Sequence, residues 1–314
     1  MQILEYDQVD PAGVLQLNLL SLGYALTPER AALIRKLDAR PFPCFAVYAI
    51  EDGIVAGQVG IFRLPVMTTE GPQEIGGVWA VCTHPAFGRR GVASLLMDEA
   101  HARMREAGLR FSSLGTARHR GAHQFYLRQG YEDIYTPAFT FARLRDIRQD
   151  TYLRAERAAA EQLPLVDAFY QRAAAGRLGF ARRSQDHLAM TVAAGDLSAG
   201  DVWLLWDGDR LSGYALATIS ENILSVNSLL LSSGVEAWQA VAAIAKSREV
   251  IYASVQADHP SVERGLQNGG FPACLPGWST VMIKPLAPGH SLEGARRWLG
   301  VGTEQFLISN IDVT

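Results

Sequence analysis

The second half of this 314-residue chain repeats the first half in a degraded form, and the repeat limits the folds available to it. Three pairs of segments carry it: residues 202–208 (VWLLWDG) with 47–53 (VYAIEDG), Gly234-Val235-Glu236 with Gly91-Val92-Ala93, and His259 to Gly270 with His119 to Gly130, eleven positions in both cases. Self-similarity of this kind indicates a duplicated structural unit. A length of about 150 residues per domain also favours two domains.

We therefore divide the chain into a first domain over residues 1–147, a second over 148–286 and a tail over 287–314. The junction falls in residues 146–163, which are charged, alanine-rich and helical in propensity. Residues 305–313 alternate well enough to predict a late strand.

Composition excludes several classes of protein. The chain is 48% hydrophobic and 19% charged, which is too apolar for a disordered chain. A formal net charge of −3 and a pI near 6.2 argue against a nucleic-acid partner. No apolar run reaches the ~20 residues of a membrane span. Three widely spaced cysteines indicate neither a disulfide framework nor a metal knuckle, so we expect a cytoplasmic protein without a metal.

The first domain alternates strand and helix signals. In order, we expect strands at 3–6, 44–50, 54–64, 77–82, 111–114 and 135–144, with helices at 14–20 and 28–37 after the first strand and at 92–107 and 121–129 on either side of the fifth. Glu51-Asp52-Gly53 predicts a hairpin turn, Pro65 the end of a strand, and residues 68–73 a polar loop. The order indicates a mixed α/β fold.

The segment from Val81 to Leu96 joins a strand that is apolar on both faces to an amphipathic helix through a loop of glycines and arginines. A helix N-terminus leaves backbone N–H groups unpaired and carries the positive end of the helix dipole. Small residues let the backbone approach a ligand, so this turn suits a phosphate or pyrophosphate. Residues 89–128 hold eight arginines and three acidic residues, a basic patch within a first domain of balanced charge.

Two motifs in this region resemble the GNAT family of N-acetyltransferases. The window Gly88-Arg89-Arg90-Gly91-Val92-Ala93, after Pro85, resembles the acetyl-CoA motif Q/R-x-x-G-x-G/A, and His119, Ala122, Tyr126, Gly130 and Tyr131 match a later pattern, N-x-x-A-x-x-x-Y-x-x-x-G-F/Y. The departures are Gly88, where the family has Gln or Arg, and His119, where it often has Asn. The resemblance covers residues 1–145 and implies tandem GNAT-like domains, the second degenerate, with some likeness to the Eis-like group.

The resemblance implies direct transfer of an acetyl group from acetyl-CoA to a primary amine in a ternary complex. Main-chain groups of Val81 and Thr83 would pair with pantetheine, and Tyr126 would protonate the departing thiolate. The pyrophosphate and the rest of the cofactor would be held by Gly88, Arg89, Arg90, Gly91, Val92, Ala93, Ser94 and His119.

The general base stays open. The family often uses a glutamate near the fourth strand or a water, and Glu74 is the nearest carboxylate here; it reads equally well as a solvated loop residue. His84 can titrate near neutral pH, although a structural role suits it as well. The Eis-like group brings a C-terminal carboxylate into the site, which would be that of Thr314. His84, His101, His119 and His123 lack a metal-binding motif such as HExxH, so we expect no metal ion.

In the second copy Glu236 replaces Ala93, Leu266 replaces Tyr126, and the arginine pair has no counterpart. A carboxylate there repels a pyrophosphate, so we expect the second domain to be structural. The alternative for the whole chain is a non-catalytic acyl-CoA-binding sensor. The acceptor could be an aminoglycoside, a polyamine, an amino-acid-like metabolite or a peptide. Helices within residues 14–37 and the loop 66–76 should line the acceptor side of the site. The acids in and beside these segments favour a cationic acceptor: Glu29, Asp38, Glu70 and Glu74. No membrane partner is expected, and a homodimer is possible.

Overall fold

The computed structural model describes residues 1–246, 250–309 and 311–312, and the chain forms two compact units. Unit 1 contains Met1–Tyr135 and Ser279–Leu299; unit 2 contains Thr136–Trp278 and Gly300–Asp312. Each unit is built on one mixed sheet, so the predicted mixed α/β class is confirmed.

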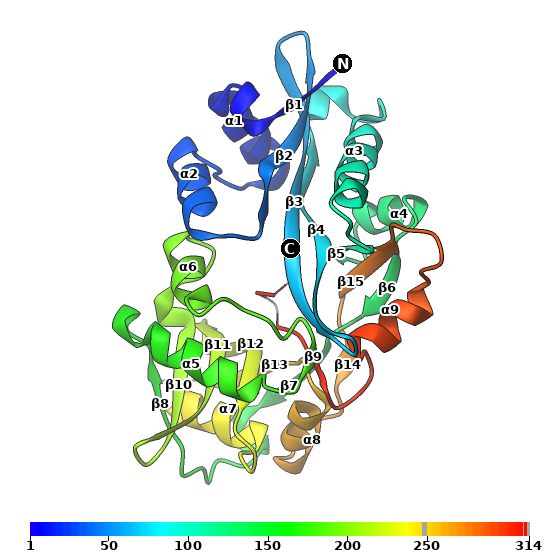
Figure 1. Ribbon diagram of the computed structural model, residues 1–314. Helices are drawn as coiled ribbons and strands as arrows, with labels where there is room; N and C mark the ends of the chain where they lie inside the picture. The colour runs from blue at the N-terminus through cyan, green and yellow to red at the C-terminus, as the bar shows by residue number, and fades with distance from the viewer. Residues whose placement is uncertain (247–249, 310, 313–314) are drawn as a thin grey trace. The chain divides into compact units, whose positions relative to one another are not determined.

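Unit 1 has helices on both faces of its sheet (Figure 1). Its strands run in the order β1-β2-β3-β4-β5-β15-β6. Their bounds are β1 Gln2–Glu5, β2 Pro41–Glu51, β3 Ile54–Thr68, β4 Gly71–Thr83, β5 Phe111–Ala117, β6 Glu132–Tyr135 and β15 Ser279–Pro285. The helices are α1 Pro11–Leu22, α2 Pro28–Leu37, α3 Val92–Glu106, α4 Gly121–Arg128 and α9 Leu292–Leu299.

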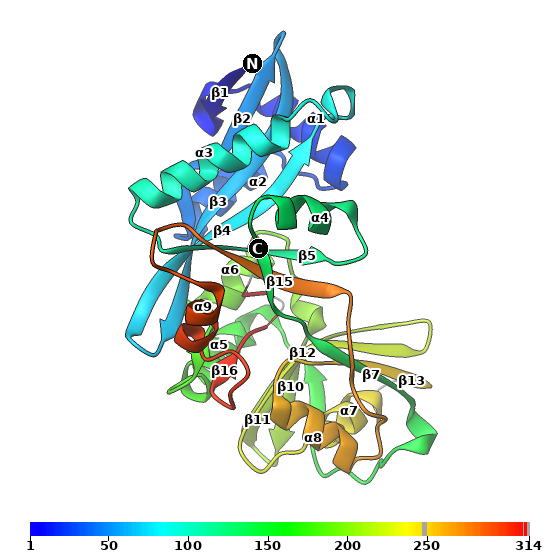
Figure 2. The ribbon, with the colours of Figure 1, turned by 90° about the vertical axis from the view of Figure 1, so that its right-hand side faces the viewer.

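Two faces of this sheet carry different chemistry. Helix α3 lies across β2, β3 and β4 (Figure 2) and buries an aliphatic core against them. That core includes Val47, Val59, Val78 and Leu96, all at most 2% exposed. On the other face α1 is tied to β3 by a buried pair, because Asn18 Nδ2 donates to Gln58 Oε1 over 2.8 Å.

The helix ends follow from local sequence. Thr27 caps α2 by accepting from Arg30 N–H, with Pro28 in the first turn. Gly108 and Gly130 take φ of 75° and 85° after α3 and α4, the left-handed conformation that glycine adopts without a Cβ clash.

Unit 2 repeats the core of unit 1 on a second sheet, ordered β14-β7-β13-β12-β11-β10-β8. The strands of this sheet are β7 Ala138–Arg143, β8 Arg154–Arg157, β10 Val202–Asp207, β11 Arg210–Ser220, β12 Ile223–Leu231, β13 Tyr252–Ala257 and β14 Leu275–Pro276. Unit 2 also contains β9 Leu178–Gly179 and β16 Phe306–Leu307, which pair with each other in parallel and are not part of this sheet. Its helices are α5 Leu163–Ala173, α6 His187–Ala193, α7 Ala237–Lys246 and α8 Pro260–Asn268. The series β10-β11-β12-α7-β13-α8 matches β2-β3-β4-α3-β5-α4, in agreement with the repeat seen in the sequence.

Each unit contains one strand from the part of the chain that the boundaries at residues 147 and 286 assign to the other domain. The strand predicted over 135–144 is two strands: β6 ends at Tyr135, and β7 pairs with β13 in unit 2. Pro137 interrupts the run because proline lacks an N–H donor. In return β15 pairs with β5 and β6 and places Met282 in the core of unit 1.

Three local predictions were wrong. Residues 146–163 are not one helix: they include β8, whose backbone pairs with β10, so tertiary pairing overrides helix propensity. Pro65 does not end β3, which continues to Thr68 with Pro65 opposite Glu74 in the β3–β4 hairpin that replaces the predicted polar loop. The late strand is confined to Phe306–Leu307 among the described residues; Asn310 and Val313, also in the predicted span, lie outside them.

Candidate functional site

Strands β4 and β5 of unit 1 separate along their length. Their parallel pairing is confined to Gly76–Ser112 and Gly77–Ser113. Beyond that point β4 runs on to Thr83 paired with β3, and Val81 and Thr83 are half-buried. The Thr83 carbonyl accepts from Ser21 Oγ over 3.1 Å. Because β5 pairs with β4 at Gly76 and Gly77, the edge of β4 beyond Gly77 and away from β3 can pair with an extended amide chain.

The turn between β4 and α3 presents backbone donors without acceptors. Gly91 has a φ of 82° and Arg89 a φ of 59°, so both take the left-handed conformation in which successive N–H groups converge. The described contacts give no acceptor to the N–H groups of residues 89–94. Together with the helix dipole of α3 they form an anion-binding site.

The side chains of this turn are not equivalent. Arg90 makes an ion pair with Glu51 and lies over the Phe87 ring at 5.1 Å, so its charge is partly compensated. Arg89 is exposed. A Cβ at Gly88 would lie 3.3 Å from the Pro85 carbonyl, so the tight 3-10 turn at Pro85–Phe87 favours glycine where the family has a long side chain.

Tyr126 lies on α4 and is 8% exposed. Its ring contacts those of Phe125 and Tyr131, at centroid distances of 5.3 and 6.0 Å. Burial, with a smaller contribution from Cys82, raises the pKa of Tyr126 to about 12. The phenol therefore keeps its proton at neutral pH, as a general acid requires.

The histidines of this region have separate partners. His101 Nε2 bonds the Tyr131 hydroxyl over 2.8 Å, and burial followed by the Lys284 charge lowers the pKa of His101 to about 3. His123 Nε2 bonds Asp133 over 2.9 Å. Within the described part of the chain no three His, Cys, Asp or Glu side chains form a metal-binding group.

Two of the candidates for a general base, Glu74 and His84, lie near opposite ends of β4. Glu74 forms a half-exposed ion pair with Arg63, at 3.3 Å, on the β3–β4 hairpin. His84 caps a short 3-10 helix by accepting from Ala86 N–H, which is a structural role. Thr314 lies outside the described residues.

The acids expected to attract a cationic acceptor are engaged within unit 1. Asp38 forms a bidentate pair with Arg40, and Glu70 pairs with Arg110, whose hydrogen bond lowers the pKa of Glu70. Glu29 accepts from its own backbone and from Thr27, which lowers its pKa. These carboxylates therefore do not form an unpaired negative surface.

Comparisons with known proteins agree with this geometry. Residues 14–134 match the family model described as an acetyltransferase (GNAT) domain. A GCN5-related N-acetyltransferase from Kribbella flavida superposes with a TM-score of 0.65 at 18% identity, covering 91% of this chain and 72% of that one. A conserved protein of unknown function from Enterococcus faecalis V583, titled a probable N-acyltransferase, gives 0.68 at 15% with the same coverage. Eis1 from Mycobacterium abscessus gives 0.56 at 15%, covering 91% and 74%. A search of curated proteins found no match.

Because these matched residues lie in unit 1, we call unit 1 the GNAT domain. The chain as a whole has the tandem fold of its structural neighbours. Among the described residues no helix is long and apolar enough to cross a membrane.

Unit 2, the second GNAT-like unit, keeps the turn before its helix α7, but backbone N–H groups of this turn have acceptors. Gly234 has a φ of 86°, close to that of Gly91. However, Val235 N–H donates to the Ser232 carbonyl and Glu236 N–H to Gln239 Oε1, so this turn satisfies part of its own hydrogen-bonding capacity. Glu236 also accepts from Asn268 of α8 over 3.1 Å, which places a carboxylate at the start of α7.

Helices α7 and α8 also pack directly on each other. A Cβ on Gly265 would lie 2.7 Å from Ala237 N, and a Cβ on Gly269 would lie 2.1 Å from Trp238 Cβ. The corresponding positions in the GNAT domain are Phe125 and Gln129, and the Gln129 side chain reaches α3, where its Nε2 donates to Ser94 Oγ over 3.2 Å. In unit 2 the two helices are therefore in direct contact, although the turn before α7 still lines a pocket.

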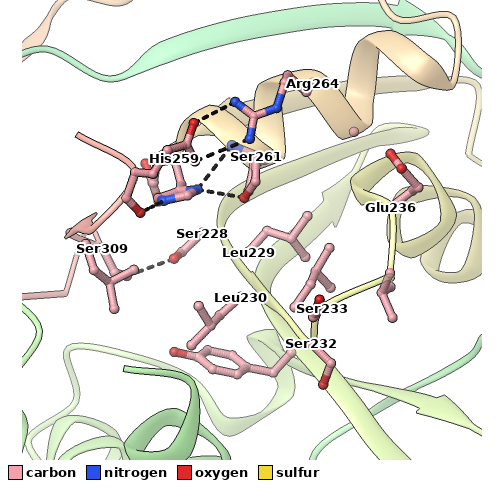
Figure 3. A pocket seen from close by; sticks show the side chains of 18 of the residues that line it. Ser228, Leu229, Leu230, Ser232, Ser233, Glu236, His259, Ser261, Arg264 and Ser309 are labelled. Carbon is pink, nitrogen blue, oxygen red and sulfur yellow. Dashed lines mark hydrogen bonds and ion pairs between the residues drawn. The ribbon is translucent and has the colours of Figure 1, made fainter. Parts of the chain in front are cut away.

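A pocket of about 670 Å³ remains in unit 2, where β12 and β13 separate (Figure 3). Arg264 pairs with the Glu304 carboxylate, and Arg177 bonds His259 Nε2 and the Glu304 carbonyl. The C-terminal segment lines the pocket, with Ser309 Oγ bonded to Ser228 Oγ over 2.8 Å. Figure 3 shows Glu236 across the pocket from Arg264 and His259. The Glu236 carboxylate, which also lines the pocket, disfavours a pyrophosphate there.

An aromatic cluster in the GNAT domain was missed by sequence reasoning. Phe45, Phe62 and Trp79 come from three neighbouring strands and are in ring contact. Their strand registers depend on bulges at Phe45 and Ala80, whose φ values are 61° and 47°. Alternation along β3 and β4 shows that Phe62 and Trp79 can share a face, but no sequence signal gives the bulges.

Proposed function

We propose that the GNAT domain transfers an acetyl group from acetyl-CoA to a primary amine, and that unit 2 binds no CoA. The observation that carries the proposal is the row of backbone N–H groups at residues 89–94 that have no acceptor among the described contacts, beside the separated strands β4 and β5. A pyrophosphate fits the first feature and a pantetheine chain the second.

In the proposed reaction the amine nitrogen attacks the thioester carbonyl carbon, a C–N bond forms, and the C–S bond breaks. The CoA thiolate leaves with the bonding electron pair and takes a proton from the Tyr126 phenol. The raised pKa of Tyr126, to about 12, keeps that proton available. The nitrogen gives up its own proton to a base, for which Glu74, a water and the Thr314 carboxylate stay the candidates.

Cofactor contacts are proposed for the residues of the turn. Backbone groups of Gly88, Arg89, Gly91, Val92, Ala93 and Ser94 would hold the pyrophosphate, Arg89 and Arg90 would add positive charge, and His119 would lie at the start of α4. Val81 and Thr83 would pair with pantetheine. We place the reaction in the cytoplasm, because the three cysteines are free thiols.

Two measurements on the full chain test this proposal. CoA should raise the melting temperature, since a ligand that binds the folded state stabilises it. Acetyl-CoA with a panel of amines should release free thiol, and Tyr126→Phe should remove that activity while CoA still binds. Binding of CoA with no thiol release from any amine would make the chain a sensor, and absence of CoA binding would reject both functions.

A further inference from the structure

The face of unit 1 that carries α1 and α2 holds an aromatic stack, defined as Phe45, Phe62 and Trp79. Phe62 and Trp79 lie nearly parallel, 15° apart with ring centroids at 5.2 Å. Phe45 meets the Trp79 ring edge-on at 5.0 Å. Phe45 is fully buried, whereas Phe62 and Trp79 are half-buried, so the two parallel rings form the outer part of the stack.

The strand that bears Trp79 leads directly to the proposed thioester site. A single residue lies between Trp79 and Val81, so the two are at most about 7 Å apart along the strand. Between them lies Ala80, whose φ of 47° is unusual for a residue with a Cβ. Its carbonyl accepts from Gln58 Nε2 over 3.3 Å, which holds the bulge in place. Residues forced into this conformation concentrate at ligand sites.

Glycine makes room for the indole on the neighbouring strand. Gly60 lies opposite Trp79 in the β3–β4 register, and a Cβ there would come within 2.2 Å of the indole ring. The indole therefore lies against bare backbone, which fixes its plane. A rigid ring held in this way loses little conformational entropy when a ligand stacks on it.

Charge around the stack disfavours a polycation. The Arg40 guanidinium lies over the Phe62 ring at 5.2 Å and is paired with the Asp38 carboxylate. A polyamine or aminoglycoside needs several unpaired carboxylates, whereas the charged group that contacts this stack is an arginine.

We propose that the aromatic stack selects the acceptor, and that the acceptor is a monoamine carrying an aromatic ring. The aromatic ring of the acceptor stacks on Trp79 and so continues the series of Arg40, Phe62 and Trp79. The amine of the acceptor reaches the thioester beyond Ala80. The inference rests on the proposed acetyl transfer and names the substrate class of that site.

Two matched amines test the class. Phenethylamine and cyclohexylethylamine carry the same charge on the same two-carbon arm, and they differ in the aromaticity of the ring. Wild-type enzyme should show kcat/KM about three- to tenfold higher for phenethylamine, the range expected of an aromatic pair. Spermidine should be the poorest substrate. Equal values for the two ring amines, or a preference for spermidine, would overturn the inference.

Variants locate the effect. Trp79→Leu should remove the preference for phenethylamine by raising its KM with little change in kcat, and Trp79→Phe should restore most of it. Phe141→Leu is the matched control, because Phe141 stacks on Tyr252 in unit 2 at 18° and 5.5 Å. A preference that survives in a folded Trp79→Leu, or disappears in Phe141→Leu, would contradict the assignment.

Equilibrium binding separates this inference from the proposed function. Calorimetry of phenethylamine and cyclohexylethylamine with CoA-saturated wild-type protein needs no turnover. Tighter binding of phenethylamine without thiol release from any amine would support the aromatic site and reject the acetyl transfer. Thiol release with spermidine but no binding of phenethylamine would support the transfer and reject the aromatic site.

Discussion

The two units place the same turn at the start of the same helix, but the backbone hydrogen bonding of the turn differs. Gly91 and Gly234 have nearly equal φ values, so the backbone of the loop has survived duplication. In unit 1 the N–H groups that follow have no acceptor among the described contacts, whereas in unit 2 Ser232 and Gln239 accept two of them. The difference lies in side chains and in helix packing, because the fold is shared.

This comparison teaches that a phosphate site can be lost by satisfying it internally. Glu236 supplies the negative charge that the helix dipole attracts. Gly265 then lets α8 close against α7, where unit 1 has Phe125. Reversing one of these substitutions in unit 2 should therefore not restore CoA binding there. Introducing one of them into unit 1 should weaken CoA binding by unit 1.

The largest expected effect is that of Tyr126→Phe, which removes the proposed acid that unit 2 replaces with Leu266. We expect kcat to fall about a thousandfold, within the range for general acid catalysis, with the CoA dissociation constant unchanged. Since burial raises the pKa of Tyr126 to about 12, a fall of wild-type kcat between pH 8 and 10 would have to come from another group. Steady-state thiol release across this range checks both points. A Tyr126→Phe enzyme within a few-fold of wild type would show that the thiolate leaves without this phenol.

Gly265→Phe gives α8 of unit 2 the residue found in α4 of unit 1. Its Cβ alone would lie 2.7 Å from Ala237 N, so we expect a loss of about 3 kcal/mol in the free energy of unfolding. The control in the same unit is Gly200→Ala, whose Cβ meets its nearest neighbour at 3.6 Å and should change little. Urea denaturation measures both. Equal stability of the two variants would show that α7 and α8 are not held by this contact.

Ala93→Glu transfers the Glu236 carboxylate to the start of α3. We expect CoA to bind about 30-fold more weakly, corresponding to about 2 kcal/mol for a charge at a helix terminus. Ala93→Gln has the same size without the charge and should bind CoA more tightly than Ala93→Glu. The reciprocal Glu236→Ala should create no second site, because the N–H groups of residues 235 and 236 keep their acceptors. Isothermal titration with CoA distinguishes these results.

The smallest net effect is that of pH on the stability of the wild-type chain, because one buried group in each unit changes that stability in the opposite direction. His101 in unit 1 is held neutral, because burial lowers its pKa to about 3 in the folded state. In the unfolded chain His101 binds a proton below about pH 6.5. The free energy of unfolding therefore falls with decreasing pH, by up to about 1.4 kcal/mol per pH unit. Asp258 in unit 2 has its pKa raised by burial to about 7, so its contribution is instead lost as pH rises from about 4 to 7.

His101→Phe should therefore remove the loss on acidification, and Asp258→Asn should remove the loss on raising the pH. Urea midpoints between pH 4.5 and 6.5 should show slopes of opposite sign for the two variants. Slopes of the same sign would mean that one of these groups is not buried as described.

Much of unit 1 could be predicted from sequence, because its signals are local. The α2 cap at Thr27, the glycines after α3 and α4, and the turn before α3 depend on residues a few positions apart. The exchange of β7 and β15 could not be predicted, since strand pairing across more than 100 residues leaves no local pattern. The bulges at Phe45 and Ala80 were missed for the same reason, and with them the aromatic stack.

The sequence likewise predicts some features of the site and not others. The motif gives the positions of Gly91 and Tyr126, but it does not show that Arg90 is paired with Glu51 or that Glu74 is paired with Arg63. Those pairings depend on neighbouring strands and turns. The charge of a single residue in the sequence is therefore a weak guide to the charge that a ligand meets.

The central claim is that duplication left one site that binds CoA and one that does not. Calorimetric titration of the full chain with CoA tests it most directly, because the stoichiometry is independent of the acceptor. We predict one CoA per chain, with binding weakened by Ala93→Glu and unchanged by Glu236→Ala. Two equivalent sites per chain, or a single site that ignores Ala93→Glu and responds to Glu236→Ala, would contradict the account.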